Sequence, residues 1–484
     1  MSLRDRIFKG GLKLGFGQVF SQGCSFVRSV IVARLITPAD FGIAATFSIT
    51  LSLIEMVSNL AAERLIVQSQ NGNEERFQAT IQGVQFFRGL FSGIVLFCVA
   101  EPVTRLFGVP KAAWAYQWLA LIPVFRGLIH HDITRLQRHM QFGPSILVEA
   151  ISIGSVTIFA YPLGIWLGDY SCMLWIILAQ TALAMVLSHI FAERRYRWAF
   201  ERDYVREMVH FGWPLLINGF LLFGILQGDL FVIGSADRIF GENLYSLETL
   251  GKYSVAFSMT FAPTMLITNI STPLFLPLLS TVQADKEIFI RRYDFVCQAI
   301  TLFGGMLAIT FIVSGEWFVR IIYGAKYAAN VSGLVAWLAA MQALRIIRTG
   351  PTLAAIAKGD TRNAMYSNMA RSVMLIATLY IVSIGGHVSL IAASGFAGEL
   401  LALVFCLWRL QRKHGIHAII CMKLSFIAGA FMIAGPAVIA FLQEPVTMGT
   451  NIFISGVTVI LFSGWILTSF SNFRNDIVMF VKGN

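Results

Sequence analysis

The sequence predicts an all-α integral membrane protein, because it is rich in apolar residues, poor in charge and divided into long apolar runs. Hydrophobic residues make up 56% of the 484 residues, charged residues only 13%, and the mean hydropathy is +0.70. Soluble domains usually carry about a quarter charged residues. This chain therefore lacks the polar side chains that would cover a soluble surface.

The apolar runs are long enough to cross a bilayer as helices. The hydrocarbon core needs roughly 20 mostly apolar residues per helix, and short connections leave no room for an extramembrane domain. We therefore expect about fourteen transmembrane helices, near residues 14–36, 40–62, 78–101, 113–130, 144–166, 171–192, 211–235, 253–280, 295–315, 328–347, 364–384, 386–408, 424–442 and 451–471.

Basic residues are concentrated on one side of this predicted topology. The N-terminal segment, the even-numbered loops and the C-terminal tail hold 27 Lys and Arg, whereas the odd-numbered loops hold seven, when Arg34, Arg126 and Arg345 near helix ends are counted with the adjoining loops. Cytoplasmic loops carry such an excess, so both termini are expected in the cytoplasm. The overall excess of 37 basic over 26 acidic residues does not indicate nucleic-acid binding, because the basic residues are scattered between apolar segments.

Short patterns in the first half of the chain recur in the second half, in the same order and at nearly constant spacing. A duplication with small loop insertions produces this arrangement. The matches are Thr46–Thr50 with Ala256–Thr260, Asn59 with Asn269, Glu101-x-x-x-Arg105 with Glu316-x-x-x-Arg320, and Lys111 with Lys326.

The duplicated segment holds six predicted helices, so both copies cross the membrane in the same sense. Copies of this kind are related by a pseudo-two-fold axis along the membrane normal. The sequence thus predicts two six-helix bundles, at 1–205 and 206–415. Two additional transmembrane helices and a cytoplasmic tail follow at 416–484.

Polar and charged residues recur at helical spacing within 14–36, 40–62, 78–101 and 144–166. A charged side chain at membrane depth costs roughly 2.5–3.5 kcal/mol on insertion scales. A polar helix face there must look onto other helices or onto water, not onto lipid. These faces favour a hydrated central cavity, and hydrogen bonds that hold neighbouring helices together are the alternative interpretation.

Arginines and carboxylates within the helices suit different roles. Arginine grips phosphate in a bidentate manner, whereas a buried carboxylate can bind H⁺ or Na⁺ and couple transport to an ion gradient. A plain Arg–Glu neutralising pair is the alternative. The candidate substrate-binding residues are Arg28, Arg88, Arg371, Gln18, Gln85 and Asn59, and the candidate ion-coupling residues are Glu55, Glu149, Asp229 and Glu399.

No catalytic or metal-binding pattern occurs in the sequence. It has no P-loop, HExxH or GxSxG motif, and no GxGxxG after a strand. Its six cysteines are far apart and lack the spacing of metal ligands. We therefore expect no catalytic residue, no metal and no cofactor, with H⁺ or Na⁺ as the only candidate coupling ion.

The stretch VARLITPADFGIAA at 32–45, which joins the first two predicted helices, resembles a stretch typical of Wzx-type oligosaccharide flippases. This polysaccharide-transporter family belongs to the superfamily that also holds the MATE multidrug exporters and the lipid II flippase. The stretches LGKYSVA at 250–256 and LQRHMQF at 136–142 are similar to the same family.

The resemblance implies a MATE-like fold, in which two six-helix bundles form a V-shaped central cavity that opens alternately to each side. It implies an undecaprenyl diphosphate-linked oligosaccharide as substrate, flipped to the periplasmic leaflet of the bacterial inner membrane. The product would serve lipopolysaccharide, capsule or exopolysaccharide synthesis. Implied partners are membrane lipids and the polysaccharide polymerase and chain-length proteins. Arg28 and Arg88, with Arg371, would then hold the diphosphate.

Two other functions are alternatives to the flippase. A cation-coupled multidrug exporter of the same fold would prefer an acidic, aromatic cavity suited to cationic drugs. A membrane enzyme such as a polysaccharide polymerase or ligase would present sizeable periplasmic loops with catalytic Arg or His. The longest predicted outer loop, 236–252, has no His, so an enzyme is not expected.

Overall fold

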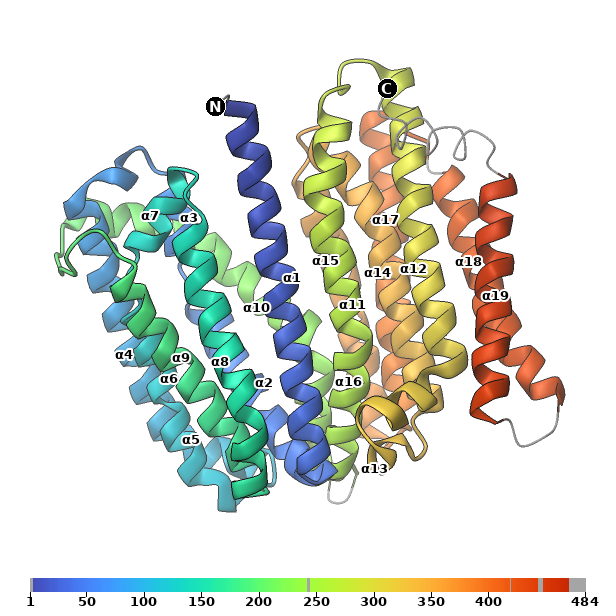
Figure 1. Ribbon diagram of the computed structural model, residues 1–484, viewed down its shortest axis with the longest axis horizontal. Coiled ribbons are helices and arrows are strands. Elements are labelled where there is room, and N and C mark those ends of the chain that lie inside the picture. The colour runs from blue at the N-terminus through green and yellow to red at the C-terminus, as the bar shows by residue number, and fades with distance from the viewer. Residues whose placement is uncertain (1–2, 242–243, 418, 443–446, 470–484) are drawn as a thin grey trace. The chain divides into compact units, whose positions relative to one another are not determined.

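The computed structural model is helical, as the sequence predicts (Figure 1). It describes residues 3–241, 244–417, 419–442 and 447–469, and no strand occurs within these ranges. The expected all-α fold class is therefore confirmed.

The chain packs as two compact units, Met1–Ser254 and Val255–Asn484. Their boundary falls inside the long helix α11, which begins in the first unit. The predicted divisions after residues 205 and 415 stay predictions. The helices up to this boundary are α1 (Leu3–Leu35), α2 (Pro38–Ser58), α3 (Ala62–Gln68), η1 (Gln70–Asn73), α4 (Glu75–Leu106), η2 (Pro110–Ala112), α5 (Ala113–Leu119), α6 (Leu121–Gly127), α7 (Asp132–Arg138), α8 (Gly143–Leu167), α9 (Ser171–Ile190), α10 (Arg202–Ile239) and α11 (Leu247–Ser280).

The second unit continues from α11 with long helices, the short connecting helix α13 and the pair α15–α16. Its remaining helices are α12 (Lys286–Ile322), α13 (Ala325–Ala328), α14 (Ser332–Ala357), α15 (Arg362–Ser372), α16 (Met374–Ser383), α17 (Val388–His414), α18 (Ile419–Leu442) and α19 (Met448–Ser469).

Nine helices within the described ranges are long and apolar enough to cross a membrane: α2, α4, α8, α9, α10, α11, α12, α17 and α19. The other predicted segments fall on α1, α14 and α18 and on two pairs of shorter helices, α5–α6 and α15–α16. The chain is therefore a multi-pass membrane protein, and its count of fourteen spans stays a prediction.

Two segments expected as single helices are interrupted. The segment 113–130 divides into α5 and α6 at Ala120. Pro123 lacks the N–H that would donate to the carbonyl four residues earlier, and its ring crowds that turn. The segment 364–384 divides at Val373, whose carbonyl accepts from the Ile376 N–H at 3.1 Å in a tighter, three-residue turn.

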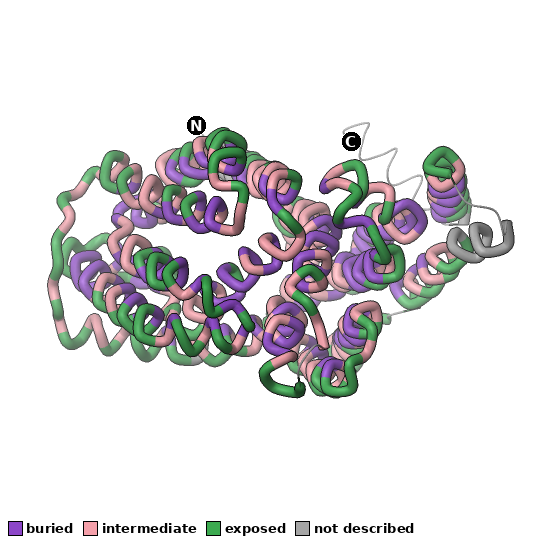
Figure 2. The backbone as a smooth tube through the Cα atoms, turned by 90° about the horizontal axis from the view of Figure 1, so that it is seen from below, coloured by how far each residue is buried: buried purple, intermediate pink, exposed green. Residues whose placement is uncertain are grey.

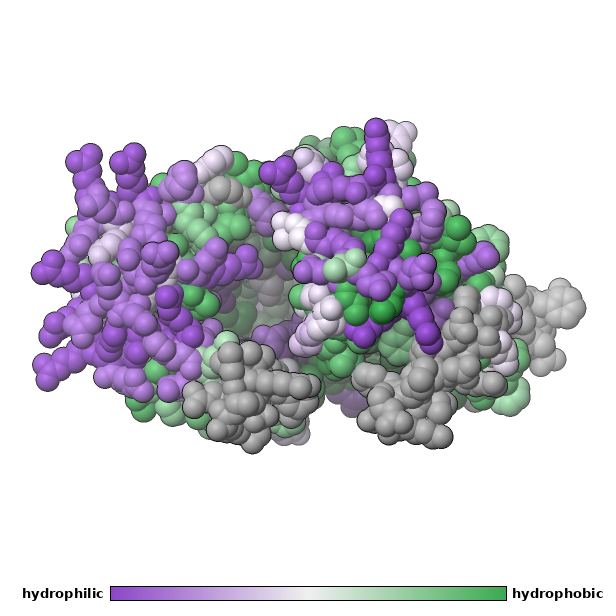
Figure 3. Space-filling model, turned by 90° about the horizontal axis from the view of Figure 1, so that it is seen from above, coloured by the Kyte–Doolittle hydropathy of each residue, from purple (hydrophilic) through white to green (hydrophobic). Residues whose placement is uncertain are grey.

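Large apolar side chains cover much of the helix surface, as expected of helices in contact with lipid. Figure 2 shows exposed and buried residues alternating along most helices, so each has one face that packs and one that does not. Figure 3 shows hydrophilic side chains gathered over helix ends within each unit. This distribution suits helices whose middle lies in hydrocarbon.

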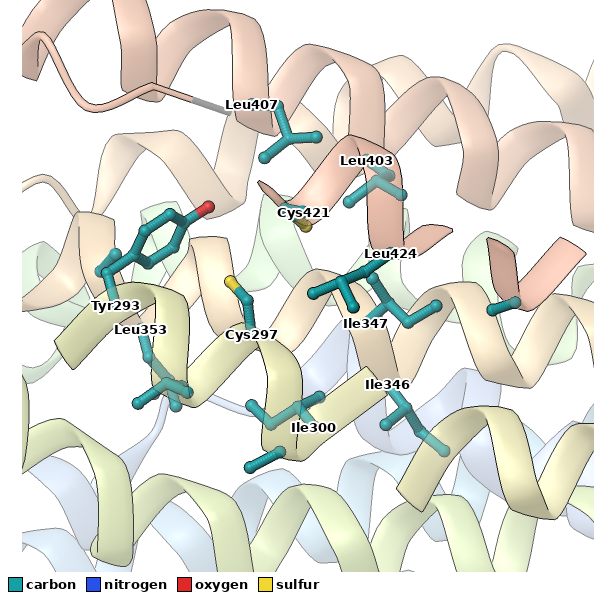
Figure 4. Packing of buried hydrophobic residues seen from close by; sticks show 14 of the residues in the cluster. Tyr293, Cys297, Ile300, Ile346, Ile347, Leu353, Leu403, Leu407, Cys421 and Leu424 are labelled. Atoms are coloured by element: carbon teal, nitrogen blue, oxygen red, sulfur yellow. The ribbon is translucent and has the colours of Figure 1, made fainter. Parts of the chain in front are cut away.

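The core of the second unit joins α12, α14, α17 and α18 (Figure 4). Cys297 of α12, Ile347 of α14, Leu403 of α17 and Leu424 of α18 lie in one buried cluster. Phe462 of α19 is also fully buried there. The last two helices are thus packed on one face, although α18 still exposes Phe426 and α19 exposes Phe453 and Ile460.

The residues just before the repeated stretches Thr46–Thr50 and Ala256–Thr260 meet in the first unit. A Cβ atom added to Gly42 of α2 would overlap the carbonyl oxygen of Leu247, and one added to Gly251 of α11 would overlap the carbonyl oxygen of Pro38. Gly251 lies 209 residues after Gly42, and Leu247 lies 209 residues after Pro38. The two contacts are therefore reciprocal: each glycine lies against the residue that corresponds to the one whose carbonyl oxygen faces the other glycine. A two-fold relation between the two segments produces such a reciprocal contact. Both glycines belong to the stretches that resemble the flippases.

A buried carboxylate holds the chain where it leaves α9. Asp132, at the start of α7, is fully buried. Its carboxylate accepts from Arg135 Nε at 2.6 Å, Gln78 Nε2 at 3.2 Å and the backbone N–H groups of Glu193 and Arg194 at 2.8 and 3.1 Å. Burial acts to raise the pKa of Asp132, but the hydrogen bonds from Arg135 and these N–H groups lower it to about 2.

The second unit repeats this arrangement with cationic side chains. Asp360, which follows α14 as Asp132 follows α6, is 2% exposed. It lies 3.4 Å from Arg409 and 3.1 Å from Lys413, both at the end of α17. Burial acts to raise the pKa of Asp360, but Lys413 and Arg409 hold it below its usual value. In each predicted six-helix repeat, a carboxylate that follows the fourth predicted span therefore binds the end of the sixth.

The contact between the glycines predicts that Gly42→Ala and Gly251→Ala both destabilise the protein. A methyl group has no room at either position, and overpacking costs about 1–3 kcal/mol. Thermal unfolding of the purified protein in detergent measures the change. Gly464→Ala is the matched control, since a Cβ there meets nothing within 4 Å. Equal stability of the Gly42 and Gly464 variants would contradict the contact.

Asp132→Ala should lower the stability of the first unit by about 3–5 kcal/mol, because it leaves buried donors and Arg135 without their partner. The pKa of Asp132 falls from 3.8 to about 2 on folding. Its contribution is therefore complete above about pH 5 and is lost as the pH falls toward 2. The difference in Tm between wild type and variant should stay constant from about pH 5 to 8, and exposed Asp203→Ala should leave Tm unchanged.

Candidate functional site: charged side chains within the helices

Three arginines surround one carboxylate in the second unit. Glu399 of α17 is completely buried. One of its oxygens lies 2.7 Å from Arg345 Nε and 2.8 Å from an Arg371 terminal nitrogen. The other lies 3.3 Å from Arg348 Nε. All three arginine side chains are about nine-tenths buried, so the group forms a charged centre inside a helical, largely apolar unit.

Local structure explains why these side chains meet. Arg345 and Arg348 stand three residues apart on α14 and therefore share one face. Gly398 precedes the carboxylate, and a Cβ there would lie 3.2 Å from the Arg371 carbonyl oxygen, so glycine allows α17 to approach α15 closely. The Thr378 and Ser394 hydroxyls, 2.7 Å apart, hold α16 against α17.

The cluster carries more positive than negative charge, because three guanidinium groups face one carboxylate. The two terminal nitrogens of Arg345 are buried and have no hydrogen-bond partner within the described residues. The Arg345 guanidinium also lies 5.6 Å from the centre of the Phe261 ring. A buried cation with free N–H groups is costly unless an acceptor reaches it. The cluster is therefore suited to an anion, above all one with several oxygens.

Charged groups in the first unit are dispersed. Glu55 of α2 forms an ion pair with Arg126 of α6. Arg88 of α4 donates to the Ser58 hydroxyl at 3.2 Å. Arg28 of α1 donates to the side chain of Gln180 on α9. Arg28 is thus bound to a neutral group, whereas Arg88 also interacts electrostatically with the carboxylate of Glu63 on α3.

The other predicted residues have varied surroundings. Gln85 is buried, whereas Gln18, Asn59 and Glu149 are exposed. The Asn59 side chain accepts from the Ala61 N–H at 2.8 Å. The carboxylate of Asp229 accepts from the Tyr253 hydroxyl at 3.0 Å.

Among the predicted residues, Arg371 and Glu399 are brought into direct contact. Arg28 and Arg88 belong to the first unit and Arg371 to the second, so a shared diphosphate site for the three stays a prediction. The ion-coupling roles of Glu55, Glu149, Asp229 and Glu399 likewise stay predictions, although Glu55 and Glu399 each have an arginine partner.

Three arginines of these clusters were missed by sequence reasoning: Arg126, Arg345 and Arg348. The segment 328–347 ends before Arg348, whereas α14 continues to Ala357 through Pro351. The apolar residues after Arg348, from Leu353 to Ala357, carried the signal that the helix goes on. Proline inside the run argued against it, since proline usually ends a helix.

Residues 31–332 match the model of a family described as polysaccharide biosynthesis protein. An uncharacterised membrane protein in the cps region of Klebsiella pneumoniae is 19% identical, over 79% of this chain and 76% of its own. The succinoglycan biosynthesis transport protein ExoT of Rhizobium meliloti is 24% identical, over 65% of this chain and 62% of its own. For the lipopolysaccharide biosynthesis protein WzxC of Escherichia coli these values are 20%, 68% and 65%.

Solved structures with the same fold are also transport proteins by their titles. The lipid II flippase MurJ in an inward closed conformation aligns with a TM-score of 0.71 at 13% identity, covering 94% of this chain and 98% of its own. An inward-facing MATE multidrug resistance transporter aligns with a TM-score of 0.66 at 11% identity, covering 82% and 95%. These likenesses confirm the MATE-like fold.

The charge cluster predicts a large cost for Glu399→Gln. Three buried guanidinium groups would lose their counter-charge, and breaking a buried ion pair costs about 3–5 kcal/mol. Adding Arg371→Gln removes one of the unbalanced charges, so the double variant should lose less than the sum of the single losses. Thermal unfolding of the four proteins measures this coupling, and strictly additive losses would show that the two side chains do not interact.

Proposed function

The chain belongs to the family of polysaccharide biosynthesis proteins, and we propose that it flips a lipid-linked oligosaccharide from the cytoplasmic to the periplasmic leaflet. Family and fold are those of transport proteins rather than enzymes. The single observation that carries the substrate class is the net positive cluster of Arg345, Arg348 and Arg371 around Glu399.

A buried group of arginines is suited to the diphosphate of such a substrate. Guanidinium groups bind phosphate oxygens with paired N–H donors, and Arg345 has two terminal nitrogens without an acceptor within the described part of the chain. We propose that the diphosphate contacts this cluster and also Arg28 and Arg88. The sugars would occupy hydrated space lined by Gln18, Gln85 and Asn59, and the undecaprenyl tail would stay in lipid.

We further propose alternating access driven by H⁺ or Na⁺. Glu55 and Glu399 already have arginine partners, whereas Glu149 is exposed and Asp229 accepts from a tyrosine hydroxyl. Of the four carboxylates, Glu149 and Asp229 are therefore better placed to exchange an ion. The proposed location is the bacterial cytoplasmic membrane with both termini inside, where polymerase and chain-length proteins would receive the product.

A cation-coupled multidrug exporter is the second candidate, because the chain shares the MATE fold. The net charge of the second-unit cluster speaks against it, since a cationic drug would be repelled by the three arginines. Deleting the gene in its host separates the two functions. We expect loss of surface polysaccharide with unchanged sensitivity to cationic drugs; the reverse pattern would establish the exporter.

Arg348→Gln and Arg88→Ala should each reduce polysaccharide export by about tenfold or more when they replace the wild-type protein in the deletion strain. One lost charge-assisted hydrogen bond is worth about 1.5–3 kcal/mol, and Glu399 keeps two arginines in the first variant. Exported polysaccharide is normalised to protein in the membrane. Arg412→Gln, an exposed change at the end of α17, is the control. Full export by both site variants would refute the assignment.

A further inference from the structure

A polar pocket of about 240 Å³ lies in the first unit between the beginning of α4 and the chain that follows α9. Gln78 and Gln82 of α4 line one wall, and Arg194, Arg195 and Arg197 line the other. It lies outside the clusters of the candidate functional site and shares Gln78, Glu193 and Arg194 with the network around Asp132. None of the five wall residues has a role in the proposed transport.

The wall of arginines is fixed in place by backbone contacts. The carboxylate of Asp132 accepts from the N–H groups of Glu193 and Arg194, and the Ala199 N–H donates to the Ala79 carbonyl at 3.2 Å. Gly83 allows this close approach, since a Cβ there would lie 2.9 Å from the Ala199 carbonyl oxygen.

Residues 195–200 form an irregular connection without helical or strand hydrogen bonding, and successive side chains along 195–198 have different surroundings. Arg195 and Arg197 line the pocket. Between and after them, Tyr196 and Trp198 pack on each other with ring centres 6.2 Å apart, and Trp198 stacks on Phe86 at 4.5 Å. The connection therefore presents cations to the pocket, while Trp198 packs on α4.

The pocket contains one buried donor without an acceptor in the described residues and two exposed cations, Arg195 and Arg197. Gln82 is 2% exposed, and its amide nitrogen has no hydrogen-bond partner within the described residues. Arg194 donates to the Gln78 side-chain oxygen at 3.0 Å, which leaves Arg195 and Arg197 as exposed cations. Two carboxylates also line the pocket: Glu75, and Glu193, which is paired with Arg135 at 2.8 Å. A buried unpaired donor costs about 1–3 kcal/mol, so the site is built for a ligand with acceptor oxygens.

Exposed aromatic rings place this site at the surface of the membrane. Phe87, Trp198 and Phe200 are 48%, 50% and 58% exposed, and Phe87 and Phe200 pack with ring centres 5.4 Å apart. Tryptophan rings such as that of Trp198 gather at the level of the lipid headgroups, and the two phenylalanines beside it offer an apolar surface to lipid. A basic pocket between helices at this level is suited to a lipid phosphate.

We propose that this pocket binds the phosphate of an anionic phospholipid headgroup. Arg195 and Arg197 supply the charge, and the Gln82 amide donates to a phosphate oxygen. The bound lipid fastens the connection between α9 and α10, which joins the two predicted six-helix repeats. The site is independent of the transported substrate, so the inference goes beyond the proposed function.

The test uses the full-length protein in vesicles of phosphatidylcholine, with and without phosphatidylglycerol. Phosphatidylglycerol should raise the Tm of the wild type. The double variant Arg195→Gln/Arg197→Gln should bind it roughly thirtyfold more weakly, because the two pocket cations contribute about 1 kcal/mol each. Gln82→Leu, which removes the donor and keeps the volume, should lose part of the effect.

Arg202→Gln/Arg206→Gln is the matched control, since it removes two exposed cations from the start of α10 outside the pocket. It should respond to phosphatidylglycerol as the wild type does; an equal loss in both double variants would overturn the pocket in favour of general surface charge. Inorganic phosphate and diphosphate, added to phosphatidylcholine vesicles, distinguish the source of the anion. Protection by these ions, with none from phosphatidylglycerol, would overturn the lipid headgroup as the ligand.

Discussion

A charge inside a bilayer must find a partner, and the interior of this protein follows from that requirement. Hydrocarbon offers neither hydrogen bonds nor counter-ions, so an unpaired charge there is expensive. Glu399 is paired with three arginines, and Glu55 is paired with one. Outside the spans, the fully buried carboxylate of Asp132 accepts hydrogen bonds from backbone N–H groups and from Arg135. Each of these carboxylates ties together elements that are distant in sequence.

The arginines outnumber the carboxylates that they contact, and this excess connects packing to function. In the second unit, one carboxylate offsets three guanidinium groups, and Arg345 keeps buried nitrogens without a partner in the described ranges. In the first unit, Arg28 donates to a neutral side chain, whereas Arg88 donates to a hydroxyl and also interacts with the carboxylate of Glu63. A protein that only needed neutral helix packing would have no use for this surplus. A substrate with phosphate oxygens would complete it.

The two predicted repeats share contacts in the folded structure as well as sequence patterns. Gly42 and Gly251 meet the carbonyl oxygens of Leu247 and Pro38 in a reciprocal manner. Asp132 and Asp360 bind the ends of α9 and α17 after equivalent helices, one mainly through backbone N–H groups and the other through Arg409 and Lys413. The two halves thus keep the position of the carboxylate while using different donors.

The sequence by itself determined the helical membrane class and the family resemblance, and it singled out Arg371 and Glu399, because apolar length and charge at membrane depth are local properties of the chain. It did not reveal that Arg345 and Arg348 join them. That depends on α14 continuing through Pro351 and on Gly398 letting α17 approach α15. Likewise, Pro123 lies in a run that reads as one helix, and only the folded chain shows the break at Ala120. Only the tertiary structure shows which arginines contact Glu399, because the residue spacing within one helix does not indicate which residues of other helices lie beside it.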